Sequence, residues 1–404
     1  MKYLILTYGT EGDTRPLSAL GRGLMDAGHD VHLLADGATL GTAAALGVPA
    51  TPIAGDIRET LQPSGSAKKS DYNTMARELA QLSNENAEHW LRATVNAGRD
   101  CDAILVSGLA GFIGLSAAEY LGVKAIGAGM FPLTPTAEFA SPLLPPGKLP
   151  RFLNKFSYHL INGLVWRVFR KATNSARAKV CGLPPRKNIW TDHPILYGVS
   201  PSLLPRPADW PSNISVCGQW LAPAKHWTPP DALNEFLSAG AAPIYIGFGS
   251  MAGFDTKQLL ATLVGGLAGR RALFYPGWSG LDTSQLPANI FVVGDTPHDA
   301  LFPRVSMAVH HGGSGTTHSA ARAGIPSVVV PFAGDQFFWA DRLHRAGVGA
   351  KLPGWKALNA DSLAASIQFA SRDDVRANAS AMGERMRAEN GVKNAVSTIE
   401  VMTG

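Results

Sequence analysis

The segment 310–317, HHGGSGTT, combines residue types that together can bind a phosphate. It follows the apolar run Met307 to Val309 and precedes small residues that favour a helix. Glycines let the backbone approach an anion, hydroxyls and a strand-end His donate hydrogen bonds, and a helix N-terminus adds free N–H groups. We therefore expect an anion site here, with a Gly-rich packing turn as the alternative. Its residues would be His310, Gly312, Gly313, Ser314, Gly315 and Thr316.

A carboxylate and a carboxamide follow the next apolar run of the chain. The segment 324–336, GIPSVVVPFAGDQ, indicates a buried strand and a loop that ends in Asp335 and Gln336. Ligands of open α/β sheets bind beyond the carboxyl ends of the strands. The two side chains could bond neighbouring hydroxyl groups, as a sugar requires, or Asp335 could instead cap a helix over 337–346.

The elements that would position these groups alternate between strand and helix in both halves of the chain. Apolar runs at 3–7, 31–35, 103–107 and 125–128 predict strands, and a first helix is expected from Pro16 to about Ala27. The pattern starts again with strands at 243–248, 271–275, 290–293, 307–309 and 327–330. Such alternation is typical of parallel sheets. We expect an α/β protein with two Rossmann-like domains that face a cleft.

Prolines mark the boundary between the two halves, because they crowd the stretch 201–231. We place a Pro-rich linker at 205–240, between domains at 1–204 and 241–380, and a C-terminal helix at 381–404. A length of 404 residues suits two domains of ordinary size.

The net charge of +5 would be compatible with a nucleic-acid binder if it were spread along the chain. It is instead local. Between Phe139 and Thr191 there are ten Lys or Arg and no Asp or Glu, so the remaining residues carry 26 basic against 31 acidic side chains. We therefore expect no nucleic-acid partner.

An apolar pattern runs through the basic segment 148–187. Leu153, Phe156, Leu160, Leu164 and Val168 recur at helical spacing. A basic amphipathic helix of this kind is typical of contact with an anionic membrane surface. The alternative is an ordinary helix with one core face and one solvated basic face.

The cysteines Cys101, Cys181 and Cys217 have no metal-binding or redox spacing, and so sparse a set favours a reducing compartment. No apolar run approaches the roughly 20 residues needed to span a bilayer. We expect a cytoplasmic protein, with peripheral contact at the inner membrane surface through 148–187 as an option.

Taken together, the motifs resemble those of the inverting Leloir glycosyltransferases of two-domain B-type (GT-B) fold. HHGGSGTT and PFAGDQ carry the resemblance, together with GDTRP at 12–16, GFGS at 247–250, GWSGL at 277–281 and PHDALFP at 297–303. It covers nearly the whole chain and is most similar to sterol and lipid glucosyltransferases and to bacterial transferases that decorate glycopeptide antibiotics. The family resemblance implies a hexosyltransferase with UDP-glucose or a related nucleotide sugar as co-substrate and no other cofactor.

The resemblance also implies a role for each matching residue. His310 would touch a donor phosphate, and Ser314, Gly315 and Thr316 would form the rest of the pyrophosphate cradle. Gly249 and Ser250 would reach the diphosphate from the other side. Asp335 and Gln336 would hold the sugar hydroxyls. Trp278 and His298 would lie near the nucleotide base, although DTPH at 295–298 replaces the Trp-x-Pro-Gln of the plant branch, so base stacking is not implied.

Asp13 is the candidate catalytic base. Inversion is a single displacement, and a base that takes the proton of the attacking hydroxyl contributes about 10²–10⁴-fold. The antibiotic and sterol branches have an Asp in this motif, whereas the plant branch has a His. Alternatively, Asp13 caps the first helix, in competition with Thr14. The neighbouring Glu11 could raise the pKa of Asp13 by like-charge repulsion, or it could point away.

No metal is expected, because His310, backbone N–H groups and the helix dipole would stabilise the leaving diphosphate. The Asp-x-Asp pattern at 100–102 is interpreted as a chance match, since it lies before a strand. The chain has no GxxxxGK[ST] loop, and its first turn is not GxGxxG, which disfavours a P-loop nucleotidase and a dehydrogenase.

The acceptor should be an apolar molecule with a hydroxyl group, such as a sterol, a lipid or a natural product. The aromatic-rich and acid-poor span 131–169 would line its entrance, with Phe131, Phe139 and Phe156 as the candidate contacts. Two alternatives remain at this point: a nucleotide-sugar epimerase of the same fold, and a membrane-surface or nucleic-acid binding module.

Overall fold

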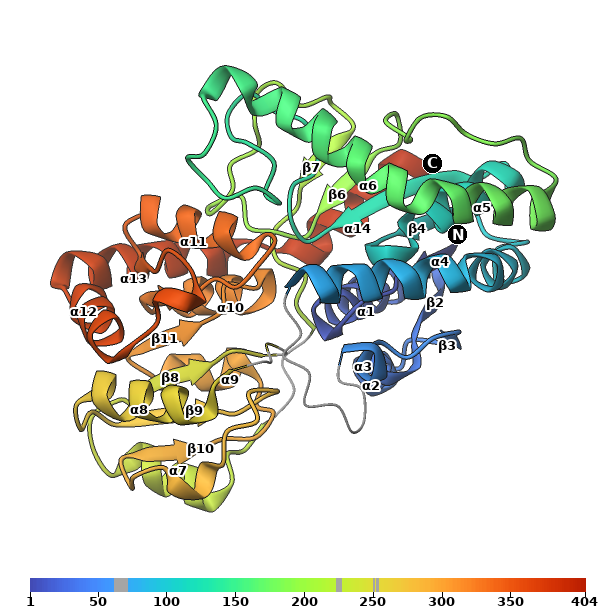
Figure 1. Ribbon diagram of the computed structural model, residues 1–404. Helices are drawn as coiled ribbons and strands as arrows, with labels where there is room; N and C mark the ends of the chain where they lie inside the picture. Colours follow the sequence, from blue (N-terminus) through green and yellow to red (C-terminus); the bar gives the residue numbers. More distant parts are fainter. Residues whose placement is uncertain (62–71, 223–226, 250, 252–253) are drawn as a thin grey trace.

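The computed structural model describes residues 1–61, 72–222, 227–249, 251 and 254–404. Within these residues the chain forms two parallel sheets with helices on both faces, as Figure 1 shows. The prediction of an α/β protein with two Rossmann-like domains is confirmed.

The first sheet has seven strands in the order β3-β2-β1-β4-β5-β6-β7. Its strands are β1 (Lys2–Leu6), β2 (Asp30–Asp36), β3 (Ala50–Ile53), β4 (Ala103–Val106), β5 (Lys124–Gly129), β6 (Ile195–Tyr197) and β7 (Ile214–Val216). The helices of this domain are α1 (Glu11–Asp26), α2 (Gly41–Ala45), α3 (Ile57–Leu61), α4 (Tyr72–Ala97), α5 (Gly111–Leu121) and α6 (Asn154–Ala176).

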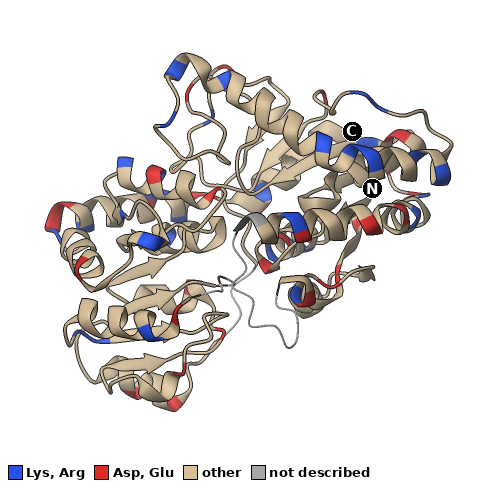
Figure 2. Cartoon of the chain, in the orientation of Figure 1, with Lys and Arg blue, Asp and Glu red and all other residues tan. Residues whose placement is uncertain are grey.

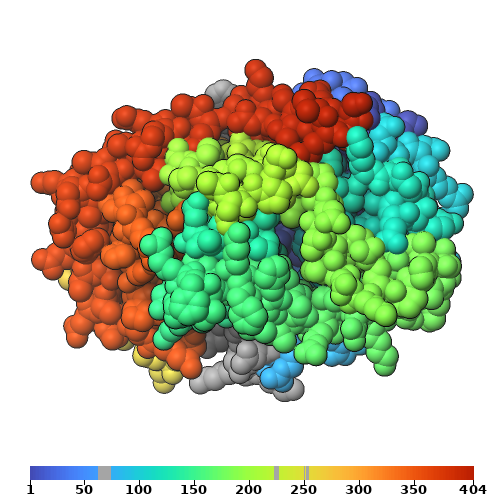
Figure 3. All heavy atoms as spheres, turned by 90° about the horizontal axis from the view of Figure 1, so that it is seen from above, coloured from blue at the N-terminus to red at the C-terminus, as the bar shows by residue number. Residues whose placement is uncertain are grey.

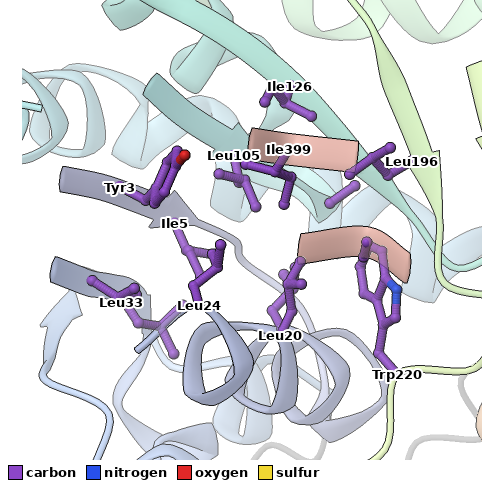
Figure 4. Packing of buried hydrophobic residues seen from close by; sticks show 14 of the residues in the cluster. Tyr3, Ile5, Leu20, Leu24, Leu33, Leu105, Ile126, Leu196, Trp220 and Ile399 are labelled. Carbon is purple, nitrogen blue, oxygen red and sulfur yellow. The ribbon is translucent and has the colours of Figure 1, made fainter. Parts of the chain in front are cut away.

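Alternation along the strands divides the first core into two layers. Tyr3 and Ile5 of β1 point to the face that α1 covers, as Figure 4 shows, whereas Leu4 and Leu6 point to the opposite layer, which includes buried residues of α4 and α5. Successive side chains of a strand lie on opposite faces, so a continuous apolar run is required where both faces are covered. This explains why the first strand could be located from its sequence.

The second sheet has six strands in the order β10-β9-β8-β11-β12-β13. They are β8 (Ile244–Gly247), β9 (Ala272–Tyr275), β10 (Ile290–Val292), β11 (Met307–His310), β12 (Ser327–Val329) and β13 (Gly349–Lys351). The helices are α7 (Asp231–Ser238), α8 (Thr256–Leu267), α9 (His298–Leu301), α10 (Ser314–Ala323), α11 (Gln336–Arg345), α12 (Ala360–Ala370) and α13 (Asp373–Ala388).

Three boundaries differ from those expected. Strand β7 pairs with β6, so the first sheet extends into the stretch 205–240 that was expected to be a linker. The expected helix at 381–404 is two helices, α13 and α14 (Gly391–Thr403), because Glu389 is extended and Asn390 caps the second one. Helix α1 begins at Glu11 rather than at Pro16, because Thr10 is its N-cap.

Helix α14 returns to the first domain. Its residues Ala395, Val396 and Ile399 are buried in the same core as Ile5 and Leu20. Figure 3 shows the C-terminal helices in red, running along one side of the molecule from the orange second domain to the first. The two domains are therefore joined by two stretches of chain rather than one.

Candidate active site

The turn between β11 and α10 presents unsatisfied donors. Gly313 is the N-cap of α10, no side chain caps this end, and the first turn holds no acidic residue. The N–H of Thr317 bonds to the carbonyl of Gly313 at 3.0 Å, whereas the preceding N–H groups lack acceptors within the helix by its geometry. A helix start with free donors and a positive dipole end suits an anion.

His310 ends β11 and is fully buried. Its Nδ1 accepts a hydrogen bond from the N–H of Gly312 at 3.1 Å, so the proton of the neutral ring lies on Nε2. Nε2 has no hydrogen-bond partner among the described residues. Burial, followed by the neighbouring His311 and His298, lowers the pKa of His310 to about 3. His310 is therefore a neutral donor with an unused N–H, which is the form that a phosphate oxygen accepts from.

Gly312 joins this turn to the loop before α11. Its φ is +91°, and a Cβ there would lie 2.8 Å from Cγ1 of Val329 and 3.0 Å from the carbonyl oxygen of Gln336. Only glycine permits both the conformation and the close approach. The anion-binding turn and the Asp335-Gln336 loop are therefore packed against each other.

Gln336 is held at both ends of its carboxamide, by its own loop and by a weak contact with Met251. Its Oε1 accepts hydrogen bonds from the N–H groups of Phe332 at 2.8 Å and Ala333 at 3.1 Å. Its Nε2 lies 3.6 Å from Sδ of Met251. The carboxamide therefore fixes its own loop with the oxygen, and the second N–H of its N–H₂ group can donate to a sugar hydroxyl.

Asp335 precedes α11, and its side chain does not cap this helix. Its Oδ2 accepts a hydrogen bond from the indole N–H of Trp339 at 3.0 Å. Burial is the main cause that raises its pKa to about 7, and the Asp13 carboxylate adds to the rise. Asp13 belongs to the first domain and Asp335 to the second, so the two carboxyl groups lie near each other across the domain boundary.

Asp13 is half-buried in the first turn of α1. Its Oδ2 accepts a hydrogen bond from the N–H of Thr10 at 2.9 Å, so it completes a capping box whose N-cap is Thr10. Thr14 is not the competitor for this role, because its hydroxyl bonds to Thr39 at 2.8 Å. Burial raises the pKa of Asp13 to about 6, although the hydrogen bonds with Thr10 lower it in part. Asp13 thus has a structural bond and a pKa suited to a base near neutral pH.

Gly249, predicted at the diphosphate, follows β8, while Trp278 and His298, predicted near the base, lie in the loop after β9 and at the start of α9. The N–H of Trp278 donates to the carbonyl of Gly249 at 3.1 Å, which ties two of these loops together. The ring of His298 stacks on Phe302 with centroids 4.3 Å apart, and burial lowers its pKa to about 4. Ser250 lies outside the described residues.

Helix α1 faces these loops through charged groups. Burial lowers the pKa of His298, and the positive charge of Arg15 lowers it further. Burial also raises the pKa of Glu11; the charge of Arg15 opposes this rise and that of Asp295 adds to it. Glu11 also lies 3.7 Å from Arg15. Glu11 is not among the causes of the raised pKa of Asp13, which are burial and the opposing hydrogen bonds with Thr10, so the structure does not support the expected like-charge repulsion between Glu11 and Asp13.

Sequence reasoning missed two residues. The ring of His311 fills the space between two glycines, since a Cβ on Gly313 would lie 2.4 Å from its Nε2 and a Cβ on Gly249 would lie 3.0 Å from its Cε1. Trp339 orients Asp335, and their spacing of four residues across a helix start was the available signal.

The predicted acceptor residues do not form one group. Phe139 packs against Phe338 of the second domain with centroids 5.2 Å apart, and Phe131 packs against the same cluster between the domains. Phe156 is exposed on α6. Over the described part of the chain, no three His, Cys, Asp or Glu side chains gather as they would around a metal ion.

A family model described as "Erythromycin biosynthesis protein CIII-like, C-terminal domain" matches residues 273–402. A sterol 3-beta-glucosyltransferase of Debaryomyces hansenii is 32% identical over 98% of this chain, which spans 26% of that relative. Sterol 3-beta-glucosyltransferase UGT80B1 of Arabidopsis thaliana is 31% identical, over 98% of this chain and 67% of the relative. Among solved structures, the glycosyltransferase VinC in complex with DTDP matches with a TM-score of 0.70 at 19% identity, covering 100% of this chain and 99% of that one.

Proposed function

Since the chain belongs to the glycosyltransferase family that includes the sterol 3-beta-glucosyltransferases, we propose that it is an inverting hexosyltransferase. It transfers glucose from UDP-glucose to a hydroxyl group of an apolar acceptor such as a sterol, a lipid or a natural product. The observation that supports this most is that Asp13 of the first domain lies close enough to Asp335 of the second for its charge to raise the pKa of Asp335, in a protein whose buried His310 has an N–H without a partner among the described residues.

In the proposed reaction, the acceptor oxygen attacks the anomeric carbon of the sugar. The bond from that carbon to the diphosphate oxygen breaks, and its electron pair stays on the leaving nucleoside diphosphate. The hydroxyl proton passes to the carboxylate of Asp13. A pKa of about 6 leaves this carboxylate ionised at neutral pH and still basic enough to accept the proton in the transition state.

The second domain holds the donor in this proposal. His310 donates its Nε2–H to the diphosphate, and the N-terminus of α10 stabilises the charge that develops on the leaving group. Asp335 and the N–H₂ group of Gln336 bind the sugar hydroxyls. These groups supply what the leaving diphosphate needs, so we propose a reaction without a metal or another cofactor, with the nucleotide sugar as co-substrate.

The acceptor is proposed to bind on the side of the first domain, beside the segment that includes Phe131 and Phe139. Across the described residues, no helix has the length and apolar content to cross a membrane. We propose that membrane contact is peripheral and made through 148–187.

The test combines an acceptor panel with a pair of matched variants. Mass spectrometry of a mixed sterol, flavonoid and macrolide panel incubated with UDP-glucose and dTDP-glucose should show a hexose added to one class. Asp13→Asn keeps an acceptor for the N–H of Thr10 and should lower transfer by about 10²–10⁴-fold with UDP affinity nearly unchanged. Glu11→Gln, a neutralised carboxyl in the same turn, should retain transfer.

Two results would contradict the proposal. Normal turnover by Asp13→Asn would remove this residue from the role of base. Conversion of the UDP-sugar without any acceptor, and without release of the sugar, would indicate an epimerase instead.

A further inference from the structure

Helix α6 exposes a row of large apolar side chains. Phe152, just before the helix, is 82% exposed, Phe156 is 58%, Leu160 48%, Leu164 47% and Val168 50%. These five residues, the α6 row, follow each other at intervals of four and so lie along one side of the helix. Single exposed apolar side chains are common, but a continuous row of this kind marks an interaction surface.

The other side of α6 already has its core contacts. Trp166 is buried, its indole N–H donates to the carbonyl of Lys187 at 3.0 Å, and its ring meets Phe112 edge-on at 5.0 Å. Tyr158 is buried as well. The α6 row is therefore a second apolar side that faces solvent, which differs from an ordinary helix with one core face and one solvated basic face.

Several cations on α6 and in the segments next to it have no acidic partner. Of the ten basic residues between 139 and 191, four make ion pairs: Lys155 with Asp209, Arg177 and Arg186 with Glu119, and Lys179 with Glu88. The other six are exposed and have no salt bridge to an acidic side chain in the described part of the chain. They are Lys148, Arg151, Arg167, Arg170, Lys171 and Lys187. Figure 2 shows blue residues gathered on α6.

We infer that the α6 row and its six unpaired cations form a docking surface for an anionic lipid bilayer, with the row inserted at the boundary between headgroups and acyl chains. An apolar side with flanking cations has the chemistry of an interfacial helix. A second copy of this chain fits the surface poorly, because two faces with only positive charge would repel each other. In Figure 3 the green residues that include α6 lie on the face turned toward the viewer.

The surface is linked to the proposed acceptor side. The N–H of Ser141 donates to the hydroxyl of Ser157 at 2.8 Å, and Nδ2 of Asn154 donates to the carbonyl of Ala137 at 2.8 Å. The start of α6 is thereby fixed to the segment that carries Phe139. A docked α6 would hold the entrance for an apolar acceptor against the membrane that contains the acceptor. This last step, unlike the docking itself, rests on the proposed function.

Vesicle flotation of the full chain tests the docking directly. We expect binding to vesicles of phosphatidylcholine with 30% phosphatidylglycerol, weaker binding as salt is raised, and little binding to phosphatidylcholine alone. Arg167→Gln/Arg170→Gln/Lys171→Gln should weaken binding on the order of 100-fold. The control Lys257→Gln/Arg376→Gln/Lys393→Gln removes the same charge from exposed positions elsewhere and should bind as the parent does.

A second pair of variants tests the apolar row. Leu160→Gln/Leu164→Gln should lose vesicle binding, whereas Val264→Gln/Val401→Gln, at exposed sites on α8 and α14, should keep it. Transfer to an acceptor dissolved in detergent should be the same for both pairs, and transfer to an acceptor held in vesicles should fall only for the α6 pair.

Three results would each overturn the inference. The first is an equal loss of vesicle binding in the two charge variants, and the second is binding of the parent to neutral vesicles as strong as to anionic ones. The third is a concentration-dependent dimer that the α6 variants abolish. Vesicle binding without any sugar transfer would overturn the proposed function and leave the docking surface standing. Sugar transfer without vesicle binding would overturn the docking surface and leave the proposed function standing.

Discussion

The carboxyl groups of Asp13 and Asp335 belong to different domains, yet they lie close enough for the charge on Asp13 to raise the pKa of Asp335. Burial is the larger cause for both groups, and it places the pKa of Asp13 at about 6 and that of Asp335 at about 7. Two buried carboxyl groups with raised pKa values that face each other from different domains are typical of a functional site.

The pH dependence of transfer should follow the ionisation of Asp13. A base must be deprotonated to act, so kcat/KM should rise as the pH increases through about 6 and then level off. The profile should be measured with UDP-glucose, which does not titrate in this range, and a soluble acceptor. A profile that is flat from pH 5 to pH 8 would contradict the assignment.

Stability should show the cost of keeping Asp335 charged. Its pKa is about 7 in the folded protein and about 3.9 in the unfolded chain, so the native state binds the proton more tightly. The stabilisation from this group is fully present below pH 3.9 and is lost as the pH rises through 7. Asp335→Asn keeps an acceptor for Trp339 and should raise the Tm by a few degrees at pH 8, with a smaller difference at pH 5 and with loss of transfer. An equal difference in Tm at both pH values would be evidence against this account.

His310 should act as a neutral donor rather than as a cation. His310→Ala should weaken UDP-glucose binding by about 10–100-fold, because a hydrogen bond to a charged group contributes about 1.5–3 kcal/mol. His310→Gln, which offers an N–H near the position of Nε2 and fills more of the buried space, should restore part of the affinity. Since the pKa of His310 is about 3, the ratio of parent to variant affinity should be the same at pH 5.5 and pH 8. A ratio that shrinks as the pH rises through 6.5 would indicate an imidazolium.

The strands and the two polar loops could be predicted from the sequence because both are local signals. A strand covered on two faces requires a continuous apolar run, as in Tyr3 to Leu6, and a strand end followed by HHGGSGTT restricts what the turn can bind. The return of α14 to the first domain could not be predicted. Its apolar periodicity shows that one side is buried, but it does not show that the partner is α1, which ends at Asp26, far from the start of α14 at Gly391.

The orientation of α6 shows the same limit. Its sequence contains two apolar sides, one with Trp166 and one with the α6 row, and periodicity alone does not decide which of them meets the core. Contacts with Phe112 and Lys187 decide it in the structure. Likewise, the proximity of Asp335 to Asp13 depends on how the two domains face each other, and a local sequence pattern does not contain this information.

Two glycines of the HHGGSGTT turn should separate a packing role from a binding role. An added Cβ at Gly312 would collide with Val329 and with the backbone of Gln336, and its φ of +91° disfavours any other residue. Gly312→Ala should therefore lower both the Tm and donor affinity. An added Cβ at Gly315 would meet nothing within 4 Å, and Gly315 lies in the first turn of α10, where alanine favours the helix. Gly315→Ala should keep or raise the Tm and still weaken UDP-glucose binding, because the methyl group enters the space assigned to the diphosphate. Thermal unfolding and calorimetric titration of both variants would check this, and unchanged affinity in Gly315→Ala would show that the diphosphate does not bind at the N-terminus of α10.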